Sequence, residues 1–152
     1  MKTQNRIIDQ VDKQLKKFKI LEDVVIPPKG WIFSIRKALN MSLRHLGERM
    51  TITPQSIREI EEREKNGTVS IKVLRRVGKA LNMKLVYGFI PQQDSLKSMI
   101  EKRANELAKE IVQRTSISMA LEDQKTSDEN LEKAIQDKAD EIKRKLPKHL
   151  WN

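Results

Sequence analysis

Polar side chains run along one side of residues 50–64, MTITPQSIREIEERE, and a helix with this spacing would place its isoleucines mostly on the other side. The polar members are Gln55, Ser56, Arg58, Glu59, Glu62 and Arg63. A glutamine amide can pair bidentately with adenine, and an arginine guanidinium can bind guanine or a phosphate. The same face could also be an ordinary solvated surface, or it could contact a protein. Its chemistry is therefore recognition by hydrogen bonds and charge, and the elements around it decide which partner fits.

Catalytic and metal-binding patterns are missing from the sequence. The 152 residues include no cysteine, which excludes disulfides and thiolate metal sites, and the two histidines, His45 and His149, are too far apart to suggest a zinc site. No serine or carboxylate motif accompanies His45, which favours a surface role. No stretch approaches the roughly 18 apolar residues of a membrane span, and the N-terminus lacks a signal-peptide pattern. We expect a cytoplasmic protein that is not an enzyme and needs no cofactor or metal.

Positive charge is concentrated in the N-terminal two-thirds of the chain. Residues 1–95 contain 19 Lys and Arg against 10 Asp and Glu, a net charge of +9, whereas residues 96–152 contain 12 against 11, a net charge of +1. A basic module joined to a nearly neutral segment is typical of a polyanion-binding protein with a separate assembly region. Many small proteins are basic for solubility alone, so charge by itself does not decide between the two.

Short helices should follow one another between residues 31 and 82. Apolar residues recur at helical spacing in four stretches of about 8 to 12 residues, separated by turn residues. Ser42, Thr53 and Ser70 are placed to cap the second, third and fourth helices, and Pro54 suits the first turn of the third. A tight turn before a helix with a polar outer face is typical of a helix-turn-helix, whose second helix lies in the major groove of DNA.

The remaining elements flank this group. We expect an amphipathic helix in residues 1–28, stopped by VVIPPKGW, a short strand over KLVYGFIP, and two amphipathic helices at 96–121 and 128–146. An isolated strand is unstable and would need a partner, such as the same strand of a second subunit. The C-terminal KLPKHLW is expected to be a frayed end.

The predicted fold class is all-α, with one short strand. Three parts are expected: an N-terminal amphipathic helix (1–28), a helix-turn-helix DNA-binding domain of four to five helices (29–92), and a C-terminal helical segment for dimerisation or partner binding (93–152).

The stretch IRKALNMSLRHLGERMTITPQSIREIE resembles the DNA-binding domain of phage repressors, the Xre and Cro/C1 helix-turn-helix group. The resemblance covers residues 31–82. It implies that Arg36 and Glu61 form a salt bridge between the first and third helices. Gly47 inside the second helix and Thr53 at the cap of the third also match the group.

Two positions depart from that group. Leu43 stands where phage repressors often have a glutamine, and Pro54 stands where a base-reading amide often begins the recognition helix. Base contact is therefore expected to begin at Gln55.

A wider part of the chain is similar to a narrower family, called mobile mystery protein A. The similar segments are Trp31–Leu39, Ile52–Ser56, Gly67–Thr68, Leu85–Pro91 and Thr115–Gln124. The resemblance implies a Fic-type partner encoded beside this protein, in an arrangement like a toxin and antitoxin pair. Antitoxins that block Fic proteins carry a helix with Ser or Thr, three residues, and Glu followed by Gly or Asn. The closest match here, Ser118 to Glu122, is followed by Asp123 instead.

These patterns predict a sequence-specific transcriptional repressor that binds double-stranded DNA as a homodimer and occludes an operator in its own promoter. It would also be the antitoxin-like member of a pair with a Fic-type toxin. The alternative is a protein-binding antitoxin that neutralises its partner directly, with DNA binding secondary. The residues expected to contact DNA are Ser42, Arg44, Thr53, Gln55, Ser56, Arg58, Glu59, Arg63, Lys65 and Asn66, while Arg36 and Glu61 have a structural role.

Overall fold

The computed structural model describes residues 2–121 and 128–152, with side chains described for 2–117 and 128–152. These residues form helices and no strand, which confirms the all-α class. The helices are α1 (Lys2–Phe18), α2 (Trp31–Ala38), α3 (Leu43–Met50), α4 (Pro54–Asn66), α5 (Ile71–Ala80), α6 (Leu96–Leu121) and α7 (Asp128–Lys145), with single 3-10 turns at Lys19–Leu21 and Lys148–Trp151.

The helices group into two compact units. The first, here called the four-helix unit, is Asp23–Tyr87 and contains α2 to α5. The second, here called the hairpin unit, combines Met1–Glu22 with Gly88–Asn152. The sequence suggested boundaries at 28 and 92 and a separate N-terminal helix, whereas α1 belongs to the same unit as α6 and α7.

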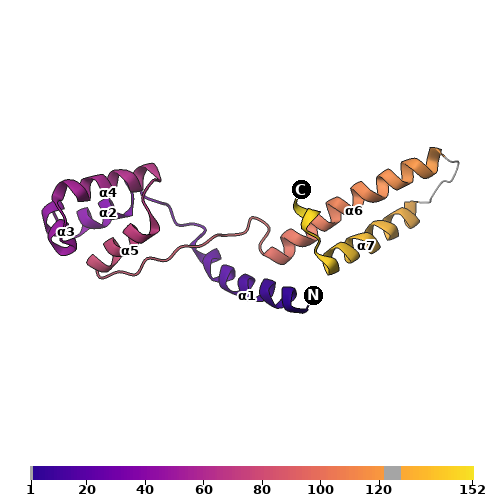
Figure 1. Cartoon of the computed structure of the whole chain (residues 1–152), viewed down its shortest axis with the longest axis horizontal. Coiled ribbons are helices and arrows are strands. Elements are labelled where there is room, and N and C mark those ends of the chain that lie inside the picture. Colours follow the sequence, from indigo (N-terminus) through magenta and orange to yellow (C-terminus); the bar gives the residue numbers. More distant parts are fainter. Residues whose placement is uncertain (1, 122–127) are drawn as a thin grey trace. The chain divides into compact units, whose positions relative to one another are not determined.

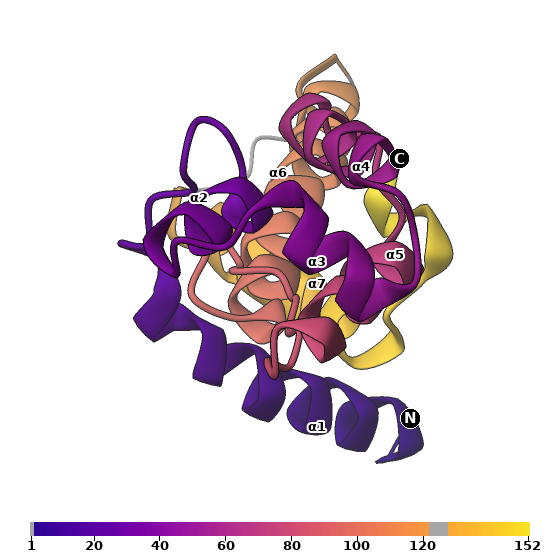
Figure 2. The ribbon, with the colours of Figure 1, turned by 90° about the vertical axis from the view of Figure 1, so that its left-hand side faces the viewer.

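In the four-helix unit, each helix contributes a side chain to one core. Ile32 of α2, Leu46 of α3, Ile57 of α4 and Val77 of α5 are buried together with Leu81. Helix α3 contacts both α4 and α5, and α2 contacts α4 (Figure 2). Burial of one apolar stripe from each short helix holds the unit together, because helices of this length are marginal on their own.

In the hairpin unit, α6 and α7 lie side by side (Figure 1). Their shared core contains Ala104, Leu107, Ala108, Ala139 and Ile142. Three of these five residues are alanines, which let the two helices approach closely along this length. Helix α1 packs against α6, where the Asp12 carboxylate accepts hydrogen bonds from the backbone N–H groups of Leu96 (2.7 Å) and Lys97 (3.2 Å). Asp12 therefore caps the start of α6 from another helix.

The C-terminal turn is held in place, and the prediction of a frayed end was wrong. Leu150 is fully buried in the core of the hairpin unit. The Arg103 guanidinium donates to the backbone oxygens of Leu150 (2.6 Å) and Asn152 (3.1 Å). These contacts offset the entropy that an end would gain by fraying.

The strand predicted over residues 84–91 is not present, since this stretch has no regular secondary structure. A strand needs a neighbouring strand for its backbone hydrogen bonds, and none of the described residues forms one beside it. Side-chain packing holds part of the stretch instead. A Cβ added at Gly88 would lie 2.6 Å from the Phe18 ring, so the backbone passes close to that ring because residue 88 is a glycine.

Within residues 2–121 and 128–152, no helix combines the length and the apolar character needed to cross a membrane.

Candidate nucleic-acid interface

Helices α3 and α4 are joined by a very tight turn. Thr51 ends α3 in the left-handed conformation (φ 59°), and Thr53 begins α4 two residues later. The turn fits because Gly47 has no side chain: a Cβ there would lie 2.6 Å from the backbone oxygen of Ile52. Gly47 and Leu46 are both buried, so the glycine sets how closely the two helices can follow one another.

The start of α3 is capped by its own side chains. The Ser42 hydroxyl accepts a hydrogen bond from the His45 backbone N–H (3.0 Å), and the His45 Nδ1 accepts one from the Ser42 N–H (3.2 Å). This reciprocal arrangement is a capping box in which histidine takes the usual place of Glu or Gln. It leaves the N–H groups of Leu43 and Arg44 without a partner among the described residues, so they can still bind an anion. The surface role predicted for His45 is thus more specifically a cap.

The start of α4 is capped in a similar way. The Thr53 hydroxyl accepts from the Ser56 N–H (3.1 Å), and the two hydroxyls are 2.9 Å apart. Because Pro54 has no N–H, only the Gln55 N–H stays available at this end. Ser56 is half-buried, and its hydroxyl is already engaged with Thr53. The hydroxyls of Ser42, Thr53 and Ser56 were all predicted to contact DNA, and each of them already has an intramolecular hydrogen bond.

One stripe of α4 is exposed along its full length. Gln55, Glu59, Glu62 and Asn66 follow one another at spacings of three and four, so they lie on one side of the helix. Arg58, Arg63 and Lys65 flank this stripe and are also exposed. None of these seven side chains has a hydrogen bond or ion pair with the described part of the chain. The structure thus brings most of the predicted contact residues onto one free surface.

Glu62 lies in the middle of this stripe and was not among the predicted contact residues. With Glu59 it places two carboxylates between the flanking cations. The surface is therefore not uniformly basic. A partner must place hydrogen-bond donors opposite the two central carboxylates of α4, and its anionic groups opposite the flanking cations.

The inner side of α4 is fixed to α2 by two carboxylates. The first is Glu61, whose pairing with Arg36 is confirmed: Nε lies 2.6 Å from Oε1, and Nη2 lies 3.2 Å from Oε2. The Arg36 Nη1 also donates to the Met41 carbonyl at 3.0 Å. The two side chains are only 6% and 9% exposed, so this is a buried, bidentate pair with its polar groups satisfied.

The second carboxylate is Glu64, for which no sequence pattern predicted a role. Its oxygens accept from the backbone N–H groups of Trp31 and Ile32, both at 2.9 Å. Glu64 thus caps α2 across more than thirty residues of sequence, and the side chain of Glu64 lies where a Cβ of Gly30 would be. Positively charged helix termini favour such a contact.

Other cations lie elsewhere on the four-helix unit. Arg44, a predicted contact residue, is 3.0 Å from Glu48 in an exposed ion pair on α3. Lys29 and Lys37 lie over the Phe33 ring, with their nitrogens 5.0 and 5.6 Å from its centre. A further basic cluster surrounds a pocket of about 550 Å³ at the C-terminal ends of α3 and α5. It consists of Arg49, Arg76 and Lys79. The unit contains 13 Lys and Arg against 6 Asp and Glu, a net charge of +7.

In the described ranges, no group of three or more Asp, Glu, His or Cys side chains converges on one point. The stretch Ser118 to Glu122, compared above with Fic-blocking helices, lies outside the described side chains.

Comparison of the chain with protein-family models, with curated proteins and with solved structures finds no match.

Proposed function

We propose that this protein is a sequence-specific DNA-binding repressor of the helix-turn-helix type, in which α3 and α4 form the motif and α4 enters the major groove. The observation that carries the proposal is the contrast between the two sides of α4. Its outer stripe is long and polar and has no partner among the described residues, while its inner side is fixed to α2 by Glu61 and Glu64. A helix that reads bases needs both properties, because specificity requires side chains that are free but a backbone that is rigidly placed.

Phosphate contacts would come from the edges of this surface. The free N–H groups of Leu43, Arg44 and Gln55 lie at helix N-termini, which attract anions. Arg58, Arg63 and Lys65 flank the central stripe of α4 and can reach the two backbones that border a groove. The net charge of +7 on the unit would add a long-range attraction.

Base contacts would come from the central stripe. Gln55 is the first side chain of α4 that can donate and accept together, and its amide matches adenine in the major groove. Glu59 and Glu62 can accept from the cytosine amino group, and they repel the phosphates of every DNA sequence. Two carboxylates in the centre therefore favour selectivity over maximal affinity.

The test is binding of the full chain to DNA sites selected from a random pool and to scrambled versions of those sites at one salt concentration. Gln55→Ala should cost about 1–3 kcal/mol on the selected site and little on scrambled DNA, so the ratio of the two affinities falls. The matched control is Gln113→Ala, which removes an exposed glutamine from α6. If Gln55→Ala leaves the ratio of selected-site to scrambled-site affinity unchanged, α4 is not the helix that contacts the bases.

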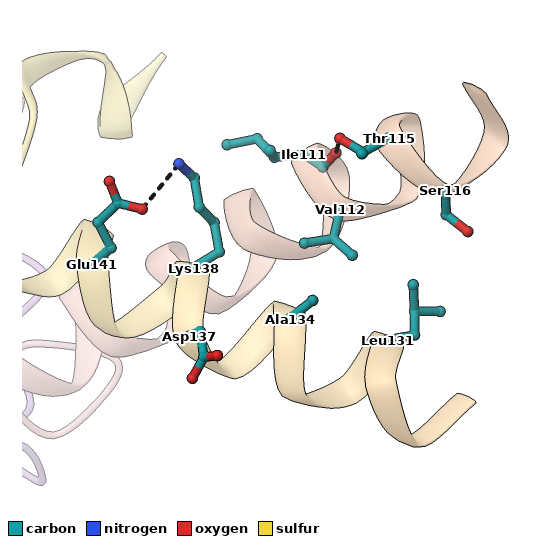
Figure 3. Close-up of a pocket in the computed structure, with 9 residues that line it drawn as sticks. All are labelled: Ile111, Val112, Thr115, Ser116, Leu131, Ala134, Asp137, Lys138 and Glu141. Carbon is teal, nitrogen blue, oxygen red and sulfur yellow. Dashed lines mark hydrogen bonds and ion pairs between the residues drawn. The ribbon is translucent and has the colours of Figure 1, made fainter. Parts of the chain in front are cut away.

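A second candidate function is neutralisation of a partner protein of the Fic type, and one feature of the hairpin unit favours it. Helices α6 and α7 border an apolar groove of about 490 Å³. Figure 3 shows Val112 of α6 and Leu131 of α7 pointing into the space between the helices, with Lys138 and Glu141 paired at one end (3.1 Å). A protein side chain or helix could fill this groove.

The experiment is co-purification with the protein encoded beside it. Val112→Glu should abolish the complex if the groove is the contact, whereas Gln55→Ala should leave it intact. A complex that survives Val112→Glu would remove the groove from this role.

A further inference from the structure

A second apolar groove lies in the hairpin unit, on another surface from the one in Figure 3. It has a volume of about 680 Å³ and is bordered by α1, by the stretch that precedes α6, by α6 itself and by the C-terminal turn. Val11, Leu96 and Met99 are among its apolar lining residues. Two aromatic side chains also border it and point largely into solvent, since Phe89 is 81% exposed and Trp151 is 54% exposed. Large exposed aromatic residues beside an apolar groove are characteristic of an interface rather than of a free surface.

We infer that this surface, here called the Phe89 surface, pairs with the same surface of a second copy of the chain, so that the Phe89 ring of each copy fills the groove of the other. The inference rests on the proposed function in one respect: a repressor that binds a two-fold operator needs two copies. The surface itself supplies the rest, because it carries both a projecting ring and a groove. A two-fold interface requires such self-complementarity, since the same patch must contact itself.

The charges at the rim of the groove fit this pairing. Lys102 and Glu106 both line it and are one helical turn apart on α6. Lys102 has no ion pair with the described part of the chain, and Glu106 has only a 3.6 Å contact with Arg103. When two copies of α6 cross antiparallel, Lys102 of each copy can face Glu106 of the other. A partner with a uniformly acidic or basic surface would leave one of these two charges opposed.

The backbone beside the groove is also free to pair. The N–H groups of Gly88, Phe89 and Ile90 donate no hydrogen bond to any described residue. A backbone with unpaired N–H groups can bind another strand. Antiparallel pairing of this stretch across the two-fold axis would supply the neighbour that a single chain lacks.

The first experiment measures the mass of the full chain by sedimentation equilibrium over a range of concentrations. The wild-type protein should be a dimer, and Phe89→Asp should raise its dissociation constant by at least about 100-fold, because each dimer loses two central aromatic contacts. The control is Ile117→Asp, which charges another exposed apolar residue (62% exposed) of the same unit that does not border the Phe89 surface. Helix content from circular dichroism shows whether each variant is folded.

The second experiment uses charge reversal in trans. Lys102→Glu and Glu106→Lys should each be monomeric alone, since like charges then face one another. A mixture of the two should form a heterodimer in which both pairs are opposite in sign again. Because each chain keeps its own substitution, a defect in folding cannot produce this rescue.

A third measurement does not depend on disruption. The chain has no cysteine, so Gln92→Cys introduces a single thiol at the groove. A short bis-maleimide should cross-link it into a dimer, and the same change at Gln113 should not.

The inference is overturned if the wild-type chain is monomeric at about 100 µM, if Ile117→Asp dissociates the dimer while Phe89→Asp does not, or if the charge-reversed chains fail to recover in the mixture. Binding to a DNA half-site separates this result from the proposed function. A Phe89→Asp monomer that still binds a half-site but loses the full operator supports both proposals. A dimer that responds as expected and binds no DNA leaves the inference standing and removes the repressor function.

Discussion

The two units use their charged residues in opposite ways. On α4 of the four-helix unit, the exposed charges have no hydrogen bond or ion pair with the described residues, and the unit has a net charge of +7. In the hairpin unit, the helices carry ion pairs three or four residues apart, such as Arg114 with Glu110 and Lys145 with Glu141. That unit has 18 Lys and Arg against 15 Asp and Glu, a net charge of +3. Charges that are already paired stabilise the helix that carries them, whereas unpaired charges are available to a ligand.

The buried Arg36–Glu61 pair is an exception in the four-helix unit, because both charges have a partner. Breaking it should have the largest effect. Arg36→Met should lower the free energy of unfolding by about 3–5 kcal/mol, because it leaves the Glu61 carboxylate buried without its partner. Urea unfolding followed by circular dichroism measures the change. The control is Arg44→Met, which breaks the exposed pair with Glu48 and should cost less than about 1 kcal/mol.

A double variant sharpens the interpretation. Arg36→Met with Glu61→Leu should recover part of the lost stability, since the stranded charge is gone. Equal stabilities for wild type and Arg36→Met would show that the pair contributes nothing to the fold.

The salt dependence of DNA binding should distinguish the cations of the four-helix unit from those of the hairpin unit. If DNA binding neutralises about six phosphates per dimer, a plot of log affinity against log salt should have a slope on the order of −5. Lys65→Ala should reduce the magnitude of that slope by about two, because each dimer loses two phosphate contacts, and should weaken selected and scrambled sites alike. Lys109→Ala, which removes an exposed lysine from the hairpin unit, should leave the slope unchanged. A flat salt response would contradict the assignment of the unpaired cations to phosphates.

Removal of an acidic residue from the reading surface should have a smaller effect, of the opposite sign. Glu62→Gln should strengthen binding to selected and scrambled DNA by about two- to five-fold, because one carboxylate no longer repels the phosphates on either side of the groove. The comparison variant is Glu132→Gln on α7, for which no change is expected. If instead Glu62→Gln weakens only the selected site, the carboxylate is a base contact.

Sequence reasoning succeeded where the determining signal is local. Ser42, Thr53 and Ser70 each cap the helix for which they were predicted, because a capping hydroxyl acts on a backbone group within three residues. Where the partner is distant, the sequence carried no usable signal. Asp12 caps α6, Glu64 caps α2, and Arg103 holds the C-terminal turn, each across more than thirty residues.

The wrong predictions have the same cause. Strand-forming residues at 84–91 have no neighbouring strand among the described residues. The charged C-terminal stretch is held by its buried Leu150 and by Arg103 of α6, which binds its backbone. Composition describes what a segment could form, but the neighbours in space decide what it does form. The Arg36–Glu61 pair is the long-range contact that was predicted, and it was predicted from a resemblance rather than from periodicity.

The smallest expected effect lies in the hairpin unit and concerns acid. The Glu141 carboxylate accepts hydrogen bonds from Lys145 (2.7 Å) and Lys138 (3.1 Å), and these contacts lower the pKa of Glu141 from 4.5 to about 2. A carboxyl whose pKa is lower in the folded protein than in the unfolded chain stabilises the fold above the higher of the two values. That contribution is lost as pH falls from about 4.5 to about 2, where the folded protein also takes up the proton.

Glu141→Gln should therefore melt at a lower temperature than wild type at pH 6, and the difference should shrink steadily as the pH approaches 2. Thermal unfolding at a series of pH values checks this, with Glu132→Gln as the variant whose difference from wild type should not follow that course. A difference for Glu141→Gln that stays constant from pH 6 to pH 2 would mean that the two lysines do not act through the charge of this carboxylate, and the contrast between paired and unpaired charges would lose its support in the hairpin unit.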